Sequence, residues 1–347
     1  MGFSNKLINW YQQNKRDLPW RNSKDAYLIW LSEIILQQTR VEQGLSYFNN
    51  FIEKYPTVAL LAKASEKEVL NLWQGLGYYS RARNLHYTAK NITKNFNGVF
   101  PVNYDDILKL KGVGEYTAAA ISSFSYNNCY PVIDGNVYRV LSRIFGIEEP
   151  IDSTNGKKTF KSLAASLIDK KNHGIYNQAI MEFGALQCKP KNPACENCPF
   201  VLECYAFKNN AIHLLPIKEK KIKQRNRYFN YLVLLNKNNI YLNKRKENDI
   251  WESLYDFPLI ETQQSIQSFD ELMSKNYNIP HSFHLIKKSK EYLHILTHQK
   301  IHATFWLVSG KFQNKLTATC VKCSIFETNN YPVPKLIENY LKTLEPI

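Results

Sequence analysis

Four of the seven cysteines in this 347-residue chain fall in one short stretch, CKPKNPACENCPFVLEC. They are Cys188, Cys195, Cys198 and Cys204, spaced as C-x6-C-x2-C-x5-C. Thiolates gathered in this way bind metal in compartments where thiols stay reduced. Structural zinc usually takes two short pairs separated by a longer loop, whereas this stretch has one short pair. The spacing therefore favours a [4Fe–4S] cluster over zinc or unliganded thiols.

The other cysteines suggest no second metal site. Cys320 and Cys323, in TCVKCS, have no partner pair, and we expect ordinary thiols in or beside a strand. Cys129 stands alone and reads as a packing residue. The first residues carry no secretory signal, and no run reaches the roughly 18 apolar residues of a membrane span. We expect a soluble, cytoplasmic protein in which these thiols are reduced.

A second motif could hold a phosphate. The stretch LKLKGVGEYTAAA places Gly112 and Gly114 between an apolar helix end and a new helix that opens at Glu115. Two glycines allow a tight turn, and the N–H groups at the start of a helix can bind a phosphate oxygen. This pattern indicates a helix-hairpin-helix motif for sequence-independent DNA binding. A plain corner between two helices is the alternative.

A carboxylate follows this hairpin. In YPVIDGNVYRVLSR, two apolar residues lead into Asp134, and a helix begins at Gly135 or Asn136. Asp134 is suited to be the N-cap of that helix. A carboxylate at this place, close to a hairpin that grips the DNA backbone, could also face a deoxyribose.

The predicted secondary structure divides the chain into three parts. Helical periodicity dominates up to about residue 208, the stretch 209–227 is polar and strongly basic, and strands then alternate with helices. We predict a helical domain over 1–208, a basic linker over 209–227 and a smaller α+β domain over 228–347. The net charge of +15 favours a polyanionic partner, with nucleic acid before an anionic membrane.

The order of these motifs resembles the endonuclease III superfamily of DNA glycosylases. The stretches LSEIILQQTRV, WQGLGYYSRARNLH, GVGEYTAAA and VIDGNVYRVLSR are similar to the MutY-type adenine DNA glycosylases, and DIWESLYDFPLIE with HILTHQKIHATFWL resembles the Nudix-like C-terminal domain of that family. The resemblance implies a mainly α N-terminal helix-hairpin-helix glycosylase domain with an iron–sulfur loop over 188–204, followed by an α+β Nudix-like lesion-recognition domain.

The resemblance implies a monofunctional glycosylase that removes adenine mispaired with 8-oxoguanine or guanine in base excision repair. Glycoside hydrolysis uses two carboxylates, here Glu33 and Asp134. Glu33 is flanked by apolar residues that should raise its pKa, as suits a general acid, while Asp134 would stay ionised and stabilise the sugar cation. Asn136 and Tyr116 match pocket residues of the family. Lyase-competent relatives carry Lys where this chain has Tyr116, and a phenol cannot form an imine.

Further residues are implied in DNA and lesion binding. Trp20 and Arg21 match residues that line the adenine pocket, and Gln37 and Gln38 lie about one helical turn after Glu33. In the family, a Gln matching Gln38 and a Tyr matching Tyr78 insert at the lesion. In GLGYY, the glycines should push Leu76 and Tyr78 outward, with Tyr79 left to the core. We expect the loop of the cysteine motif to present Lys189, Lys191 and the linker to phosphates. The resemblance implies a monomer of bacterial type that associates with the nucleoid and binds double-stranded DNA containing A:8-oxoguanine or A:G.

Two departures from the family pattern stand out. Where family members often carry Phe-Ser-His, this chain has Leu296, Thr297 and His298. The hydroxyl of Thr297 can keep the polar contact with an oxidised guanine, but the aromatic ring is lost. The Nudix-like part also lacks a run of acidic metal ligands, so nucleotide hydrolysis there is not expected. Competing functions are an endonuclease III-like glycosylase-lyase and a catalytically silent lesion-binding module.

Overall fold

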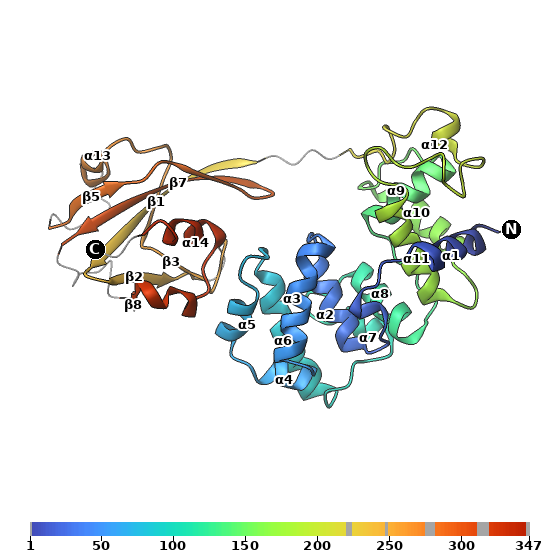
Figure 1. Cartoon of the computed structure of the whole chain (residues 1–347), viewed down its shortest axis with the longest axis horizontal. Coiled ribbons are helices and arrows are strands. Elements are labelled where there is room, and N and C mark those ends of the chain that lie inside the picture. Colours follow the sequence, from blue (N-terminus) through green and yellow to red (C-terminus); the bar gives the residue numbers. More distant parts are fainter. Residues whose placement is uncertain (1, 220–223, 247–248, 275–281, 311–318, 345–347) are drawn as a thin grey trace. The chain divides into compact units, whose positions relative to one another are not determined.

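The computed structural model shows two compact units (Figure 1). Unit 1 comprises Met1–Lys63 and Asn84–Lys220, and unit 2 comprises Ala64–Arg83 and Lys221–Ile347. The boundary at Arg83 falls inside one helix, so residues 64–83 group with the C-terminal part of the chain. The structure describes residues 2–219, 224–246, 249–274, 282–310 and 319–344.

The described residues of unit 1 form helices joined by loops, without a strand. One element, α2 (Ala26–Leu36), is buried along nearly its whole length, and Asp25 caps it by accepting a hydrogen bond from the backbone N–H of Tyr27. The remaining elements are α1 (Phe3–Asn14), η1 (Pro19–Arg21), α3 (Val41–Lys54), α4 (Val58–Lys63), α6 (Ser80–Asn95, shared with unit 2), α7 (Tyr104–Leu108), α8 (Glu115–Tyr126), α9 (Gly135–Phe145), α10 (Thr154–Leu167), α11 (His173–Leu186) and α12 (Tyr205–Lys208).

One core of unit 1 joins α1, α9, α10 and α11. Aromatic rings meet edge-to-face there: Phe183 contacts Trp10 at 4.9 Å and Phe200 at 5.4 Å between ring centroids. Three of the four clustered cysteines pack against this core. The cysteine loop is therefore attached to the same apolar interior that fixes α9 and α11.

The predicted hairpin forms between α7 and α8. Gly112 has φ +83°, and a Cβ atom added there would lie 2.8 Å from the Cβ of Asn84. Gly114 is the N-cap of α8 with φ −97°, and an added Cβ would meet nothing within 4 Å. The hydroxyl of Thr88 donates to the carbonyl of Lys111 at 2.8 Å and ties the turn to α6. Gly112 is thus needed for both backbone conformation and space, and Gly114 for neither.

These two glycines give a matched test. Gly112→Ser should lower the free energy of unfolding by at least about 1–2 kcal/mol, the cost of a left-handed non-glycine residue. Gly114→Ser should stay within about 0.5 kcal/mol of the wild type, because its backbone is ordinary and serine is a favoured N-cap. Chemical denaturation of both variants measures the difference. Equal stability of the two variants would contradict this account of the turn.

Besides the first turn of α6, unit 2 contains a mixed sheet, three α-helices and a 3-10 helix within its described residues. The long strands β1 (Arg225–Asn236) and β7 (Gln299–Ser309) pair in parallel, with Arg225 opposite Gln299 and Leu234 opposite Val308. Around them lie β2 (Asn239–Lys244), β3 (Tyr255–Asp256), β4 (Leu259–Thr262), β5 (His284–Lys288), β6 (Tyr292–Ile295), β8 (Val321–Ser324), η2 (Ile325–Asn330), α5 (Glu66–Leu72), α13 (Phe269–Ser274) and α14 (Lys335–Leu341).

The two faces of this sheet carry separate cores. Phe229, Tyr231 and Phe305 pack on one face with α14, where Tyr340 stacks on Phe305 at 3.9 Å between centroids. Leu232 and other alternate residues pack on the opposite face with α13. Since successive side chains of a strand point to opposite faces, one strand supplies both layers.

The predicted fold class is confirmed: a helical N-terminal part precedes an α+β part. The domain limits at 208 and 228 remain a prediction. Within the predicted linker, β1 already begins at Arg225, and residues 220–223 lie outside the described residues. Cys320 and Cys323 lie beside and in β8, as expected of ordinary thiols. Among the residues described, no helix is long and apolar enough to cross a membrane.

Candidate active site

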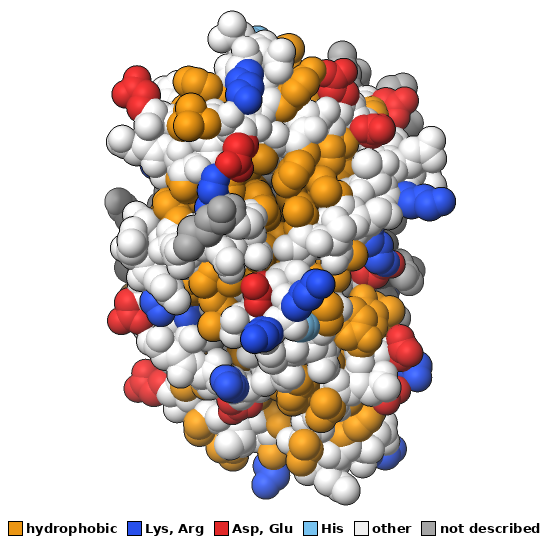
Figure 2. Space-filling view, turned by 90° about the vertical axis from the view of Figure 1, so that its right-hand side faces the viewer, with side chains coloured by type: hydrophobic (Ala, Val, Ile, Leu, Met, Phe, Trp, Pro, Cys, Tyr) orange, Lys and Arg blue, Asp and Glu red, His pale blue; other side chains and the backbone are white. Residues whose placement is uncertain are grey.

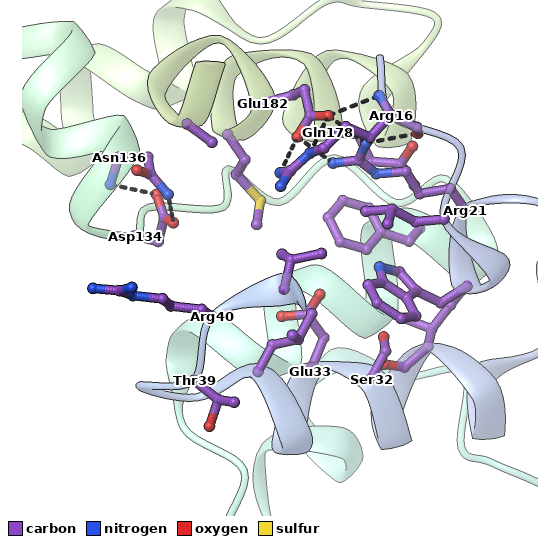
Figure 3. Close-up of a pocket in the computed structure, with 18 of the residues that line it drawn as sticks. Arg16, Arg21, Ser32, Glu33, Thr39, Arg40, Asp134, Asn136, Gln178 and Glu182 are labelled. Carbon is purple, nitrogen blue, oxygen red and sulfur yellow. Dashed lines mark hydrogen bonds and ion pairs between the residues drawn. The ribbon is translucent and has the colours of Figure 1, made fainter. Parts of the chain in front are cut away.

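A cavity of about 550 Å³ opens in unit 1 between α2, α8, α9 and α11. Figure 3 shows its arrangement: Asp134 and Asn136 lie at one side, Glu33 lies on α2, and Glu182 with two arginines closes the opposite end. The volume falls within the range of small-molecule sites, about 300–1,000 Å³. The structure brings together the four residues that the sequence proposed for chemistry: Glu33, Tyr116, Asp134 and Asn136.

Glu33 projects into this cavity from the most buried helix of the unit and is 6% exposed. Burial raises the pKa of its carboxyl group to about 7, and the nearby Asp134 adds to the rise. The hydroxyl of Tyr116 donates to Glu33 Oε2 at 2.8 Å, and this bond opposes the rise. Glu33 is therefore an acid that can hold its proton near neutral pH. The elevated pKa expected from its apolar neighbours is confirmed.

Asp134 is the N-cap of α9. Its Oδ1 accepts the backbone N–H groups of Asn136 at 2.9 Å and Val137 at 2.8 Å, and its Oδ2 accepts the side-chain amide of Asn136 at 2.7 Å. Burial raises the pKa of Asp134, and these three hydrogen bonds to the charged form oppose that rise. The start of a helix also favours negative charge. The two acids of the cavity thus have different surroundings: Glu33 accepts a phenol hydrogen bond, whereas backbone and amide donors hold Asp134.

The side chain of Arg139 supports the Asp134–Asn136 pair from behind. Its Nη2 donates to Asn136 Oδ1 at 2.8 Å and to the carbonyl of Gly184 at 2.7 Å, while Nε donates to the carbonyl of Cys188 at 2.7 Å. Gly184 has no room for a side chain, because a Cβ there would lie 2.6 Å from the Cβ of Asn136. The amide of Asn136 is consequently held with its nitrogen toward Asp134.

Sequence reasoning missed the polar end of the cavity. Glu182 on α11 is buried and accepts hydrogen bonds from Arg16 at 2.7–2.9 Å and from Arg21 at 2.7 Å. Burial alone would raise the pKa of Glu182, but the two guanidinium groups outweigh it and lower the pKa to about 2. Only Arg21 was singled out from the sequence. Arg16 and Glu182 lie 166 positions apart, in NKRDLP and IMEFGAL, and neither stretch has a spacing that signals a pair.

The other predicted residues of unit 1 lie at or beside the cavity. Trp20 is buried and lines it next to Arg21. Gln37 is half-buried just beyond the end of α2, and its amide donates to the hydroxyl of Thr117 at 3.3 Å. Gln38 is exposed and has φ +56°, an unusual conformation for a residue other than glycine. Gln38 therefore lies at a surface where the backbone turns away from α2.

A second, smaller recess of about 250 Å³ lies within unit 2. Tyr78, Thr297 and His298 all line it, and the hydroxyl groups of Tyr78 and Thr297 are hydrogen-bonded. Tyr78 is 48% exposed with φ +48°, whereas Leu76 is only 8% exposed. The expectation that Leu76 points outward is therefore wrong: the turn directs Leu76 inward and Tyr78 outward. Tyr79 is buried, as predicted.

The four clustered cysteines line one small pocket of unit 1. Arg143 donates to Cys188 Sγ at 3.6 Å, and burial raises the pKa of Cys188, Cys195 and Cys198. Among the described residues, no group of three or more His, Cys, Asp or Glu side chains lies as close together as the ligands of one metal ion do. Four thiols around one pocket are the donor set that would hold an iron–sulfur cluster.

The surface of the molecule mixes charged and apolar groups. On the face drawn in Figure 2, Lys and Arg side chains lie singly or in small groups among hydrophobic patches. The positive charge does not form one continuous block on this face. Lys189 and Lys191, which flank Pro190 after the first clustered cysteine, are exposed.

Comparison with known proteins bears on this geometry. Residues 31–166 match the HhH-GPD superfamily of base excision DNA repair proteins, and residues 230–343 match the NUDIX domain. The adenine DNA glycosylase of Buchnera aphidicola subsp. Schizaphis graminum is 35% identical over 347 residues, covering 98% of both chains. That of Arabidopsis thaliana is 33% identical and covers 93% of this chain and 61% of its own. A thermostable thymine-DNA glycosylase structure superposes with a TM-score of 0.56 at 28% identity, over 60% of this chain and 95% of its own.

Fold, cavity and matches together define a base-excision DNA glycosylase of the helix-hairpin-helix class. The chain belongs to the MutY-type adenine DNA glycosylases. It is an enzyme that hydrolyses the N-glycosidic bond of adenine in DNA.

Proposed function

We propose that this enzyme removes adenine mispaired with 8-oxoguanine, or with guanine, by hydrolysis and without efficient strand cleavage. The observation that carries the proposal is the convergence of Glu33 and Asp134 on one cavity in different surroundings: Glu33 accepts one phenol hydrogen bond, whereas Asp134 accepts three from backbone and amide donors. A protonated acid and an ionised carboxylate are the two groups that glycoside hydrolysis needs. The absence of an amine at Tyr116, whose hydroxyl instead donates to Glu33, supports hydrolysis rather than a Schiff-base route.

The reaction follows from these positions. DNA binds with the hairpin of Gly112 and Gly114 on a backbone phosphate, and the target nucleotide leaves the duplex to enter the cavity. There Trp20 and Arg21 contact the adenine, and Gln37 and Gln38 contact the DNA beside it. Tyr78, Thr297 and His298 in the recess of unit 2 read the opposite base, where the hydroxyl of Thr297 bonds the oxidised guanine.

The chemical step uses the two acids in turn. Glu33 gives its proton to N7 of adenine, the bond between the sugar carbon C1′ and N9 breaks, and adenine leaves with the bonding electrons. The ionised Asp134 stabilises the resulting oxocarbenium ion, and Asn136 holds that carboxylate. Glu33, now ionised, accepts a proton from a water molecule, and the oxygen of that water molecule bonds to C1′. Tyr116 orients Glu33 throughout.

The product assay tests this proposal. On an A:8-oxoguanine duplex, strand cleavage should appear only after hot alkali, adenine release should be slower from A:G, and borohydride should trap no covalent adduct. Asp134→Asn should abolish adenine release while retaining DNA binding, because asparagine caps a helix about as well as aspartate. Turnover by this variant close to that of the wild type would refute the assignment, and strand cleavage without alkali would favour the glycosylase-lyase.

The pKa of Glu33 makes a second prediction. With a pKa of about 7, its carboxyl group is protonated below that pH and loses the proton above it. The single-turnover rate of adenine release, followed between pH 5 and 9 at subsaturating enzyme, should therefore fall above pH 7. Glu33→Gln should be inactive. Glu115→Gln, which changes an exposed acid beside Tyr116, should keep the wild-type profile, and a flat wild-type profile would contradict the role of Glu33.

The cysteine pocket holds a [4Fe–4S] cluster in this proposal. Cys188, Cys195, Cys198 and Cys204 would supply one thiolate each, and their loop, which packs against the core of α9 and α11, would then be held so that Lys189 and Lys191 face phosphates. Purified protein should be brown and contain about four iron and four sulfide per chain. Colourless protein with one zinc per chain would show that the site takes zinc instead.

A further inference from the structure

The recess in unit 2 is built from three segments that are far apart in the sequence. Its lining comes from residues 78–83, 249–251 and 296–299. Two of these segments contain unusual backbone, with Tyr78 at φ +48° and Trp251 at φ +61°. Left-handed conformations of bulky residues persist only where the surroundings hold them. The question is what holds the three walls at fixed separations.

One buried arginine outside the lining joins two of the walls. Arg227 on β1 donates to both oxygens of Asp249, at 2.9 and 3.4 Å, and to Gln299 Oε1 at 3.1 Å. Nε and Nη2 donate to the two carboxylate oxygens of Glu261 on β4 at 2.7 and 2.6 Å, and the guanidinium lies 4.8 Å from the ring centre of Phe229. The Arg227 side chain is 10% exposed. Because the guanidinium group is planar and rigid and each of its nitrogens donates to a partner, it fixes the distances between those partners.

Two further contacts join the remaining walls. Arg83 donates to the carbonyl of Glu252 at 2.7 Å and to its carboxylate at 3.1 Å, which links the Tyr78 segment to the segment that contains Trp251. The hydroxyl groups of Tyr78 and Thr297 link the first segment to the third. Each of the three walls is therefore joined to the other two by side-chain contacts. Among these contacts, the one made by Arg227 is buried.

We propose that Arg227 is a positioning residue for recognition of the base opposite adenine: it sets the distance between the Asp249 wall and the Thr297 wall. This inference rests on the proposed function of the recess. A base that enters the recess meets Tyr78 and Thr297 directly, and the difference between 8-oxoguanine and guanine is only one or two polar atoms. Such a small difference is read only if the polar groups are held to within a fraction of an ångström.

Lysine cannot replace this arginine. A lysine ammonium is a compact charge on a flexible stem, so it can satisfy Glu261 or Asp249 but cannot bridge both and Gln299 in one plane. Arg227→Lys keeps the charge of the site and loses the bridge. It should therefore lower the ratio of the adenine-release rates on A:8-oxoguanine and A:G by on the order of tenfold, as expected for one charge-assisted hydrogen bond. The rate on A:G should remain within about twofold of the wild type, because the catalytic cavity is in the other unit.

His302→Gln is the matched control. His302 lies three residues after Gln299 on β7, bonds Glu291 at 2.9 Å and Asn226 at 3.3 Å, and does not line the recess. This variant should keep the wild-type ratio of rates. A general loss of stability in unit 2 would lower the ratio in both variants, so thermal unfolding is measured alongside. A control variant that loses discrimination as Arg227→Lys does would overturn the positioning role.

A second variant covers the case in which Arg227→Lys does not fold. Gln299→Met removes the contact between Arg227 and the Thr297 wall and keeps the length of a side chain that itself lines the recess. It should lower the ratio in the same direction. A ratio equal to that of the wild type in every folded variant of this set overturns the inference. If the wild type itself does not distinguish 8-oxoguanine from guanine, the proposed function of the recess fails as well, so the two failures can be told apart.

Discussion

The capping of α9 by Asp134 is the interaction on which the site of unit 1 depends. Buried carboxylates are costly unless hydrogen bonds satisfy them, and this one is satisfied by the backbone of the helix that it begins. The cap fixes where α9 starts and at the same time holds a negative charge at the wall of the cavity. Further residues support this arrangement. Asn136 donates to Asp134, Arg139 donates to Asn136, and Gly184 leaves the room that Asn136 needs. A residue that reads as an ordinary cap in sequence is thereby also a candidate for chemistry.

The two acids of the cavity show how one protein can place two carboxyl groups in different surroundings. Glu33 lies on a helix that is buried on nearly every side, where few donors reach it. Asp134 lies at a helix start, where donors are plentiful. Burial raises the pKa of both acids, and the position of each in the fold decides how many hydrogen bonds to the charged form oppose that rise. At the far end of the cavity, Glu182 shows the opposite limit, a buried carboxylate held ionised by two guanidinium groups.

Much of this arrangement could be predicted from the sequence, and the reason differs by residue. The hairpin, the cap and the cysteine loop are local patterns in which types and spacings carry the geometry. Glu33 was recognised through family resemblance, and its apolar neighbours correctly predicted its raised pKa. Arg16 and Glu182 were missed because their contact depends on the packing of α11 against the segment after α1, which no local pattern records. Leu76 was placed wrongly because a two-glycine turn can direct either neighbour inward, and only the surrounding core decides which.

The parallel pairing of β1 with β7 has a consequence for how unit 2 is made. Parallel neighbours cannot be joined by a tight turn, and here about sixty residues separate the end of one strand from the start of the other. The loop-closure entropy for this pair must be overcome before the central contacts of the sheet form. During synthesis, the edge of β1 that pairs with β7 stays unpaired until the chain has been extended through Ser309. The recess at the start of these strands is therefore among the last features of the molecule to appear.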